Sequence, residues 1–133
     1  MAANTNPIFP LTPVLAHVLV GSSALTSRAQ ITGTTGLTLV HAAGTNGTRY
    51  DWLILKGTGT TVAGVLDIWI YDGTNSLIFQ SVTIPVVTPS TTVDSYFNQV
   101  ALNPLILPTG YSTYCSSQVA SQLVNVAVQG GSY

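Results

Sequence analysis

The side chains in this sequence that could act in catalysis are few and far apart. They include two histidines, His17 and His41, and one cysteine, Cys115. Nucleophilic catalysis needs a nucleophile, a base and an orienting group held together, and no serine lies in a Gly-x-Ser-x-Gly segment. Both histidines fall in strand-like segments, which favours packing or surface roles. The sequence therefore predicts no nucleophilic enzyme.

Paired carboxylates are the second chemistry to consider, because an acid and a base can act together in hydrolysis. Asp51 and Asp67 fall in strands that we expect to be adjacent. Like charges that face each other destabilise a sheet, so Asp51 is expected to pair with Arg49 or Lys56 instead. A catalytic carboxylate pair is not predicted.

Metal and cofactor sites need clustered ligands or a phosphate-binding loop. The histidines, the cysteine and the four aspartates are scattered along the chain, without a Cys-x-x-Cys or His-Glu-x-x-His motif. The loop at residues 57–60 lacks the Gly-Lys-Thr ending that holds phosphate. We expect no metal, no cofactor and no enzymatic activity.

Aromatic side chains offer one binding chemistry, since exposed rings can stack on sugars. The candidates for such a platform are Trp52, Trp69, Tyr50, Tyr71, Tyr111 and Tyr114. Such rings more often fill a core or a protein interface. A carbohydrate-binding module is the alternative of a different class, and an exposed ring cluster in a concave groove would favour it.

Charged residues are unusually rare for a protein of 133 residues. They make up 5% of the chain, against 46% hydrophobic residues and a formal net charge of -1, whereas about 25% is usual in soluble domains. The scattered cations are too few for nucleic-acid or anionic-membrane binding. A near-neutral surface of this kind tends to associate, so the chain is expected to form a homo-oligomer.

The elements that position these residues are predicted to be strands, because apolar residues alternate and no 3.6-residue period is sustained. Turn residues recur every 8–12 positions, which is typical of an antiparallel sandwich. We therefore predict an all-β, antiparallel β-sandwich that is jelly-roll-like. The expected strands are 14–20, 37–41, 50–55, 62–71, 77–84, 91–100, 111–117 and 122–129.

Several local expectations follow from turn chemistry. The Asn46–Gly47 pair predicts a hairpin, and Asn103–Pro104 predicts a further turn. The segment 50–55 is apolar on both faces and is expected to be a central strand buried on both sides. Residues 130–133 are expected to form a tail.

The first thirteen residues form a predicted extended arm, followed by a single domain at 14–133. Proline fixes φ and biases the preceding residue towards extended geometry. The arm carries prolines at three-residue spacing: Pro7, Pro10 and Pro13. It also carries the apolar residues that we expect to make interface contacts, either with its own domain or with a neighbouring subunit: Ile8, Phe9 and Leu11.

Six segments together give the chain a familiar composition and turn placement: 4–13, 46–51, 56–60, 69–75, 107–111 and 129–133. They resemble the small, Thr-, Gly- and Val-rich virion structural proteins of tailed bacteriophages, some of which decorate the head. The resemblance implies a capsid decoration or cement protein located in the virion. It also implies homo-oligomers such as trimers, in contact with the major capsid protein or other virion proteins. A tail, collar or fibre component stays an alternative.

Overall fold

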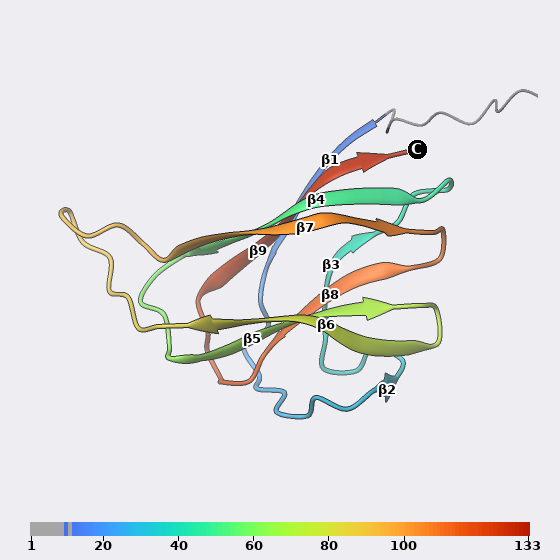
Figure 1. Cartoon of the computed structure of the whole chain (residues 1–133). Coiled ribbons are helices and arrows are strands. Elements are labelled where there is room, and N and C mark those ends of the chain that lie inside the picture. The colour runs from blue at the N-terminus through green and yellow to red at the C-terminus, as the bar shows by residue number, and fades with distance from the viewer. Residues whose placement is uncertain (1–9, 11) are drawn as a thin grey trace, which may run out of the picture.

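Alternating apolar residues build nine strands in the part of the chain that the computed structural model describes, Pro10 and residues 12–133. The strands are β1 (Thr12–Leu19), β2 (Ile31–Thr32), β3 (Thr38–Ala42), β4 (Thr48–Gly57), β5 (Gly64–Tyr71), β6 (Asn75–Ile84), β7 (Phe97–Leu107), β8 (Ser112–Ser117) and β9 (Val124–Ser132). They form two stacked antiparallel sheets, and no helix occurs in this part (Figure 1). The expected all-β, antiparallel β-sandwich is confirmed.

The strand order places segments from both ends of the chain side by side. One sheet has the order β1-β9-β4-β7 and the other β2-β6-β5-β8-β3. With the short β2 set aside, the pairs β1–β9, β3–β8, β4–β7 and β5–β6 are nested inside one another. The chain therefore follows the path of one long hairpin that is folded into two layers.

The hydrophobic core lies between the two sheets. On β9, Val124, Val126 and Val128 point inward and are buried, as the alternation predicted. Leu66 and Ile68 on β5 belong to the same buried cluster. Each of these side chains contributes about 1.5–3 kcal/mol by leaving water, so this alternation accounts for much of the stability of the sandwich.

The Asn46–Gly47 turn exists, but the hairpin predicted there is wrong. Gly47 has a φ of 91°, the left-handed region that glycine adopts without strain. The strands on either side lie in different sheets, since β3 pairs with β8 while β4 pairs with β7 and β9. The turn carries the chain from one layer to the other. Turn residues specify a local reversal but not which strand becomes the neighbour.

Strand β4 is central, as expected, but the prediction that it is buried on both sides is wrong. Its inward residues, such as Leu53 and Leu55, are fully buried, whereas its outward residues are partly or largely exposed. The prediction failed because the outward residues Trp52 and Ile54 are apolar. Apolar residues on both faces of a strand give the same sequence pattern whether or not a second layer covers the outer face.

The turn predicted at Asn103–Pro104 and the tail predicted at 130–133 are also wrong. Asn103 and Pro104 lie inside β7, at an irregularity where Asn103 takes a φ of 67°. Proline is tolerated there because β7 is an edge strand and the position is bulged. Residues 130–132 extend β9 and pair with both β1 and β4.

The outer face of the five-stranded sheet is covered by the segment that joins β1 to β3 (Figure 1). Leu25 N–H donates to the carbonyl of Ser117, and Gly33 N–H donates to the carbonyl of Thr74. Beneath this segment Trp69 is completely buried, and its Nε1 donates to Ser116 Oγ at 2.8 Å. The outer face of this sheet is therefore covered around Asp67 and Trp69 on β5, while Ser81 and Thr83 on β6 stay exposed.

The predicted arm is described only at its end. Strand β1 begins at Thr12, so Thr12 and Pro13 are part of the sheet and pair with Ser132 and Gly131. The expected contact residues Ile8, Phe9 and Leu11 lie outside the described residues.

Candidate interaction face

The outer face of the four-stranded sheet is a regular grid of side chains. Directly opposed residues on neighbouring strands point to the same side of a sheet, and the register aligns them in rows across β1, β9, β4 and β7. The rows are Leu15–Gln129–Trp52–Ala101, His17–Ala127–Ile54–Gln99 and Leu19–Asn125–Lys56–Phe97. We call this grid the outer face of the four-stranded sheet.

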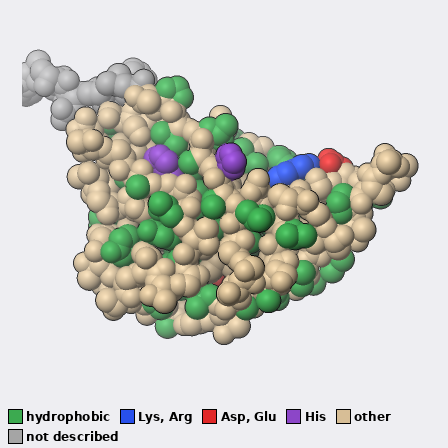
Figure 2. All heavy atoms as spheres, turned by 180° about the vertical axis from the view of Figure 1, so that it is seen from behind, with side chains coloured by type: hydrophobic (Ala, Val, Ile, Leu, Met, Phe, Trp, Pro, Cys, Tyr) green, Lys and Arg blue, Asp and Glu red, His purple; other side chains and the backbone are tan. Residues whose placement is uncertain are grey.

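This face is exposed and largely apolar. Leu15 is 69% exposed, Phe97 55% and Ile106, which is paired with Arg49, 56%. Seen from behind, the molecule carries scattered apolar side chains, and the clearly visible blue and red side chains adjoin each other near its pointed end (Figure 2). Exposed apolar area with few charges marks a surface that gains free energy when a partner covers it.

The two cations on this face are both compensated. Arg49 Nε donates to Asp51 Oδ1 at 2.8 Å, and Lys56 Nζ donates to Asp94 Oδ1 at 3.2 Å. The hydrogen bond from Lys56, followed by a backbone bond from Ser95, lowers the pKa of Asp94. The bond to Asp51 raises the pKa of Arg49. Because these charges pair locally, the face presents almost no net field to an approaching partner.

A β-bulge at the centre of β4 shapes this face. Tyr50 pairs with Gly130 but Trp52 pairs with Gln129, so Asp51 is an additional residue relative to β9. The bulge brings Asp51 and Trp52 onto the same outer side. A Cβ on Gly130 would overlap the carbonyl oxygen of Arg49, so only glycine permits this close approach.

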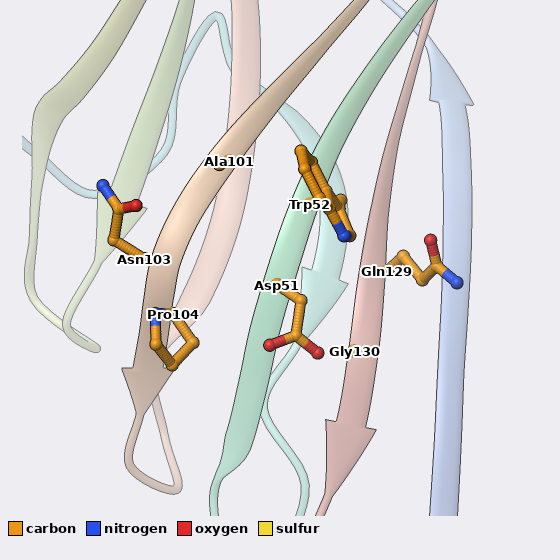
Figure 3. Close-up of a pocket in the computed structure, with 7 residues that line it drawn as sticks. All are labelled: Asp51, Trp52, Ala101, Asn103, Pro104, Gln129 and Gly130. Carbon is orange, nitrogen blue, oxygen red and sulfur yellow. The ribbon is translucent and has the colours of Figure 1, made fainter.

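An open groove of about 420 Å³ lies beside the bulge. Trp52 and Asp51 project from β4 between β7 and β9 (Figure 3). The remaining lining residues are Ala101, Asn103, Pro104, Gln129 and Gly130. Trp52 is 39% exposed, so its ring has both a packed and an accessible surface. The groove has a size within the range of small-molecule and peptide-side-chain sites, about 300–1,000 Å³.

The structure does not bring the candidate catalytic residues together. His17 is exposed on the outer face of β1, whereas His41 Nδ1 lies 2.6 Å from Tyr50 Oη, and burial lowers the pKa of His41. Cys115 is fully buried on β8, and this burial raises its pKa to about 12. A thiol with that pKa is not a nucleophile at neutral pH.

The two aspartates expected in adjacent strands lie in different sheets. Asp51 pairs with Arg49, one of the two expected partners. Asp67 is fully buried on β5, where Ser81 Oγ donates to its Oδ1 at 2.6 Å and Gln118 Nε2 donates to its Oδ2 at 2.9 Å. Arg28 in turn donates to Gln118 Oε1 at 3.2 Å. Asp67 thus anchors the covering segment to the sheet, a structural role that the sequence did not reveal.

Residues 10 and 12–133 contain no group of three or more metal-ligating side chains. Within the same residues, no helix is long and apolar enough to cross a membrane.

The aromatic residues do not form one platform. Tyr50 and Trp69 are fully buried, Tyr71 and Tyr114 make an edge-to-face pair at 5.9 Å on the five-stranded sheet, and Trp52 lies alone on the other sheet. Trp52 is therefore the one member of that set placed in the groove. The sequence places Trp52 next to an aspartate, but it gave no sign that Trp52 is exposed while Trp69 is buried.

No protein-family model matches the sequence, and a search of curated proteins finds no relative.

Proposed function

We propose that this chain is a structural protein of a tailed-bacteriophage virion, a capsid decoration or cement protein that stabilises the head through protein–protein contacts. One observation carries the proposal: the four-stranded sheet exposes an apolar, charge-compensated outer face, while the outer face of the other sheet is covered over its central strand β5. An apolar face adds no stability to a monomer in water. A subunit packed against its neighbours gains free energy, because the contact removes this apolar surface from water.

The order of the strands supports this reading. The nested pairs β1–β9, β3–β8, β4–β7 and β5–β6 support the expected jelly-roll-like arrangement of two Greek keys, to which β2 is added at one edge. Jelly rolls occur in viral capsid proteins and in lectins. The fold alone therefore does not select the function, and the chemistry of the face is what favours assembly.

The charge distribution fits a subunit present in many copies on a shell. Copies packed side by side repel one another when each has a large net charge, and this chain has a net charge of -1. A rigid sandwich with short turns supplies a body that can span neighbouring capsid subunits. DNA packed inside a head pushes outward, so such a brace stabilises the particle.

Particles that lack this protein test the proposal directly. We expect the heads to assemble but to lose DNA at a lower temperature or after milder osmotic stress than complete particles. Equal head stability together with failed adsorption or tail assembly would replace the cement function by a tail, collar or fibre function. A protein that is monomeric at tens of micromolar and does not bind particles would contradict both.

A carbohydrate-binding module is the second candidate, and the groove is the observation that favours it. Trp52 offers a partly exposed ring, and Asp51, Asn103 and Gln129 supply polar groups beside it. A glycan array with the full chain tests this function. Saccharide binding that is lost in Trp52→Ala would establish it.

A further inference from the structure

We propose that the free edge of β1 pairs antiparallel with β1 of a second copy of this chain, about a two-fold axis that passes beside His17. The inference rests on the proposed function and deepens it, because it names one contact through which copies associate. It joins two observations: β1 is a long and regular edge strand, and its outward backbone groups have no partner in the described part of the chain.

Among the edge strands of the described residues, β1 is the one that is both long and regular. It has eight residues and pairs with β9 without a register shift. The opposite edge, β7, has a register shift that involves Pro104 and a left-handed Asn103. Strand β3 has five residues and a shift near Val40, β2 has two residues, and the part of β6 beyond β2 has a bulge at Phe79. Bulges, prolines and short length keep edge strands from pairing with another chain, so β1 is the edge that these features leave open.

The direction of the backbone groups of β1 follows from its pairing with β9. Val20 N–H donates to the carbonyl of Val124 at 3.1 Å, one step beyond the last residue pair of the two strands. Hydrogen-bonded and non-hydrogen-bonded pairs alternate along an antiparallel ladder, so the even-numbered residues of β1 bond to β9. The N–H and C=O groups of Leu15, His17 and Leu19 therefore face the open edge, where no backbone bond within the described residues reaches them.

Pro13 restricts the register that a second copy can use. Its ring nitrogen, which has no N–H, also points to the open edge, so it removes no bond with β9. A two-fold axis at His17 pairs Leu15 with Leu19 of the second copy and His17 with His17, and each pair exchanges two hydrogen bonds. An axis at Ala16 would place Pro13 opposite Leu19 and lose one bond, and a shift the other way would extend beyond the end of β1.

The side chains of β1 suit a second copy of the same strand. Leu15 is 69% exposed and Leu19 46%. Directly opposed residues share a face, so the pairing sets these two leucines against each other on the outer face. On the inner face, Ala16 and Val18 pack against the core but are only partly buried, and the pairing places them opposite each other. The new strand must therefore carry apolar residues on both faces, as β1 does.

Charge also favours a second copy over a charged strand of another protein. Strand β1 contains no Asp, Glu, Lys or Arg, and the first such residue in the sequence is Arg28. Two copies of β1 therefore meet without like charges opposite each other, which would destabilise the ladder. Because the two strands are identical, one two-fold contact satisfies the outward groups of both copies.

Pairing of the β1 edges joins two four-stranded sheets into one continuous sheet and leaves its outer face uncovered. This doubled apolar face remains free to pack against other dimers or other virion subunits, as the proposed function requires. The contact gives a dimer, whereas the resemblance implies a trimer.

Charge variants at residue 17 of the full chain test the inference, because the axis places this residue opposite itself. In sedimentation velocity we expect dimers of the wild type, and we expect His17→Lys and His17→Glu each to weaken dimerisation at least tenfold through like-charge repulsion. A 1:1 mixture of these two variants should recover dimers, because a lysine then faces a glutamate. Gln99→Lys and Gln99→Glu, at the opposite edge of the same row, are matched controls and should dimerise as the wild type does. Circular dichroism checks that each variant is folded.

Cross-linking provides a second readout that does not depend on charge. Opposed Cα atoms of a hydrogen-bonded antiparallel pair lie about 5.5 Å apart, a separation that a disulfide can bridge. His17→Cys alone should therefore give disulfide-linked dimers under a copper–phenanthroline oxidant, whereas Gln99→Cys should not. The native Cys115 is buried and does not interfere.

The outcomes that would overturn the inference are distinct from those that would overturn the proposed function. Dimers that persist in both charge variants, or a trimer as the smallest assembly, would place the contact elsewhere and leave the proposed function standing. A chain that is monomeric at tens of micromolar but loses particle binding in His17→Lys would assign the edge to a strand of another virion protein. A chain that neither associates nor binds particles would contradict the proposed function as well.

Discussion

Trp52 and Trp69 both point outward from a central strand of their sheet, yet one is 39% exposed and the other is completely buried. Trp69 lies under the segment between β1 and β3 and donates a hydrogen bond to Ser116. Trp52 has no such cover in the described part of the chain. This asymmetry between the two outer faces underlies the proposed function.

Substitutions on the uncovered face should separate association from stability. Leu15→Ser or Phe97→Ser should weaken self-association tenfold or more, because each removes exposed apolar area from the face. The free energy of unfolding should change by no more than about 0.5 kcal/mol, as at other surface positions. Light scattering and urea titration measure the two quantities. Leu77→Ser, a 50% exposed leucine on the other sheet, is the matched control and should associate normally.

Gly130→Ala should destabilise the fold strongly. The new methyl group would overlap the carbonyl oxygen of Arg49 in the adjacent strand, and backbone on both sides would have to move. We expect a loss of about 3 kcal/mol or more in denaturant unfolding. Gly110→Ala meets no atom within 4 Å but has a φ of 84°, so it should cost only about 1–2 kcal/mol. Equal losses in the two variants would contradict the close-approach explanation.

Asp67→Ala should destabilise the protein by about 1–3 kcal/mol, since Ser81 Oγ and Gln118 Nε2 would each lose the buried carboxylate that accepts their hydrogen bonds. Asp51→Ala removes an exposed ion pair and should cost at most about 1 kcal/mol. Chemical denaturation of both variants provides the comparison. A larger loss for Asp51→Ala would show that the buried network is not what attaches the covering segment.

Stability should fall when the pH drops from about 7 to 5. Burial lowers the pKa of His41 below its usual 6.5, so the unfolded chain takes up this proton at a higher pH than the folded protein. Stability is therefore complete above the unfolded pKa and decreases as the pH falls from 6.5 towards the lowered value. Denaturant titrations at pH 7.5 and 5 measure the effect.

His41→Gln should remove that pH dependence, whereas His17→Gln should preserve it. Asp72 and Asp94 have lowered pKa values. Their contributions to the stability of the protein are therefore lost only at more acidic pH, below the window in which His41 acts. A pH dependence that disappears in His17→Gln instead would contradict the assignment to His41.

Cys115 should be unreactive in the folded protein. Burial raises the pKa of the Cys115 thiol to about 12 and leaves none of its surface exposed. At pH 8 the thiol is therefore protonated, and a reagent cannot reach it. A thiol reagent such as DTNB should react only after urea is added. Rapid reaction of the native protein would show that β8 opens readily.

The alternation of apolar residues was sufficient to predict the class of fold. Val124, Val126 and Val128 alternate along β9, and a period of two identifies a strand with one buried face. Asp72–Gly73 likewise predicted the turn between β5 and β6, because Asp72 Oδ1 accepts from Thr74 and Asn75 N–H groups only two and three residues away. Local contacts of this kind are encoded in a few consecutive residues.

The places where prediction failed involve residues far apart in the chain. Asn103–Pro104 has the composition of a turn but lies in a bulged edge strand, since the residues that pair on either side of it, Tyr50 with Leu105 and Trp52 with Ala101, are about fifty positions apart. Gly130 and Gly131 have the composition of a tail, yet they let β9 approach β4 and Pro10 closely. Glycine and proline indicate a special backbone geometry, but only the pairing of distant strands decides whether that geometry is a turn, a bulge or a close approach between strands.

The sequence by itself determined a nearly uncharged, all-β chain, because composition and a period of two depend only on residue order. Only the tertiary structure decided which of two similar tryptophans is exposed, and which sheet keeps an uncovered face. That choice depends on the segment between β1 and β3 lying over one sheet, held by hydrogen bonds such as Arg28 to Gln118 across ninety positions. Contacts across such separations leave no periodic pattern in the sequence.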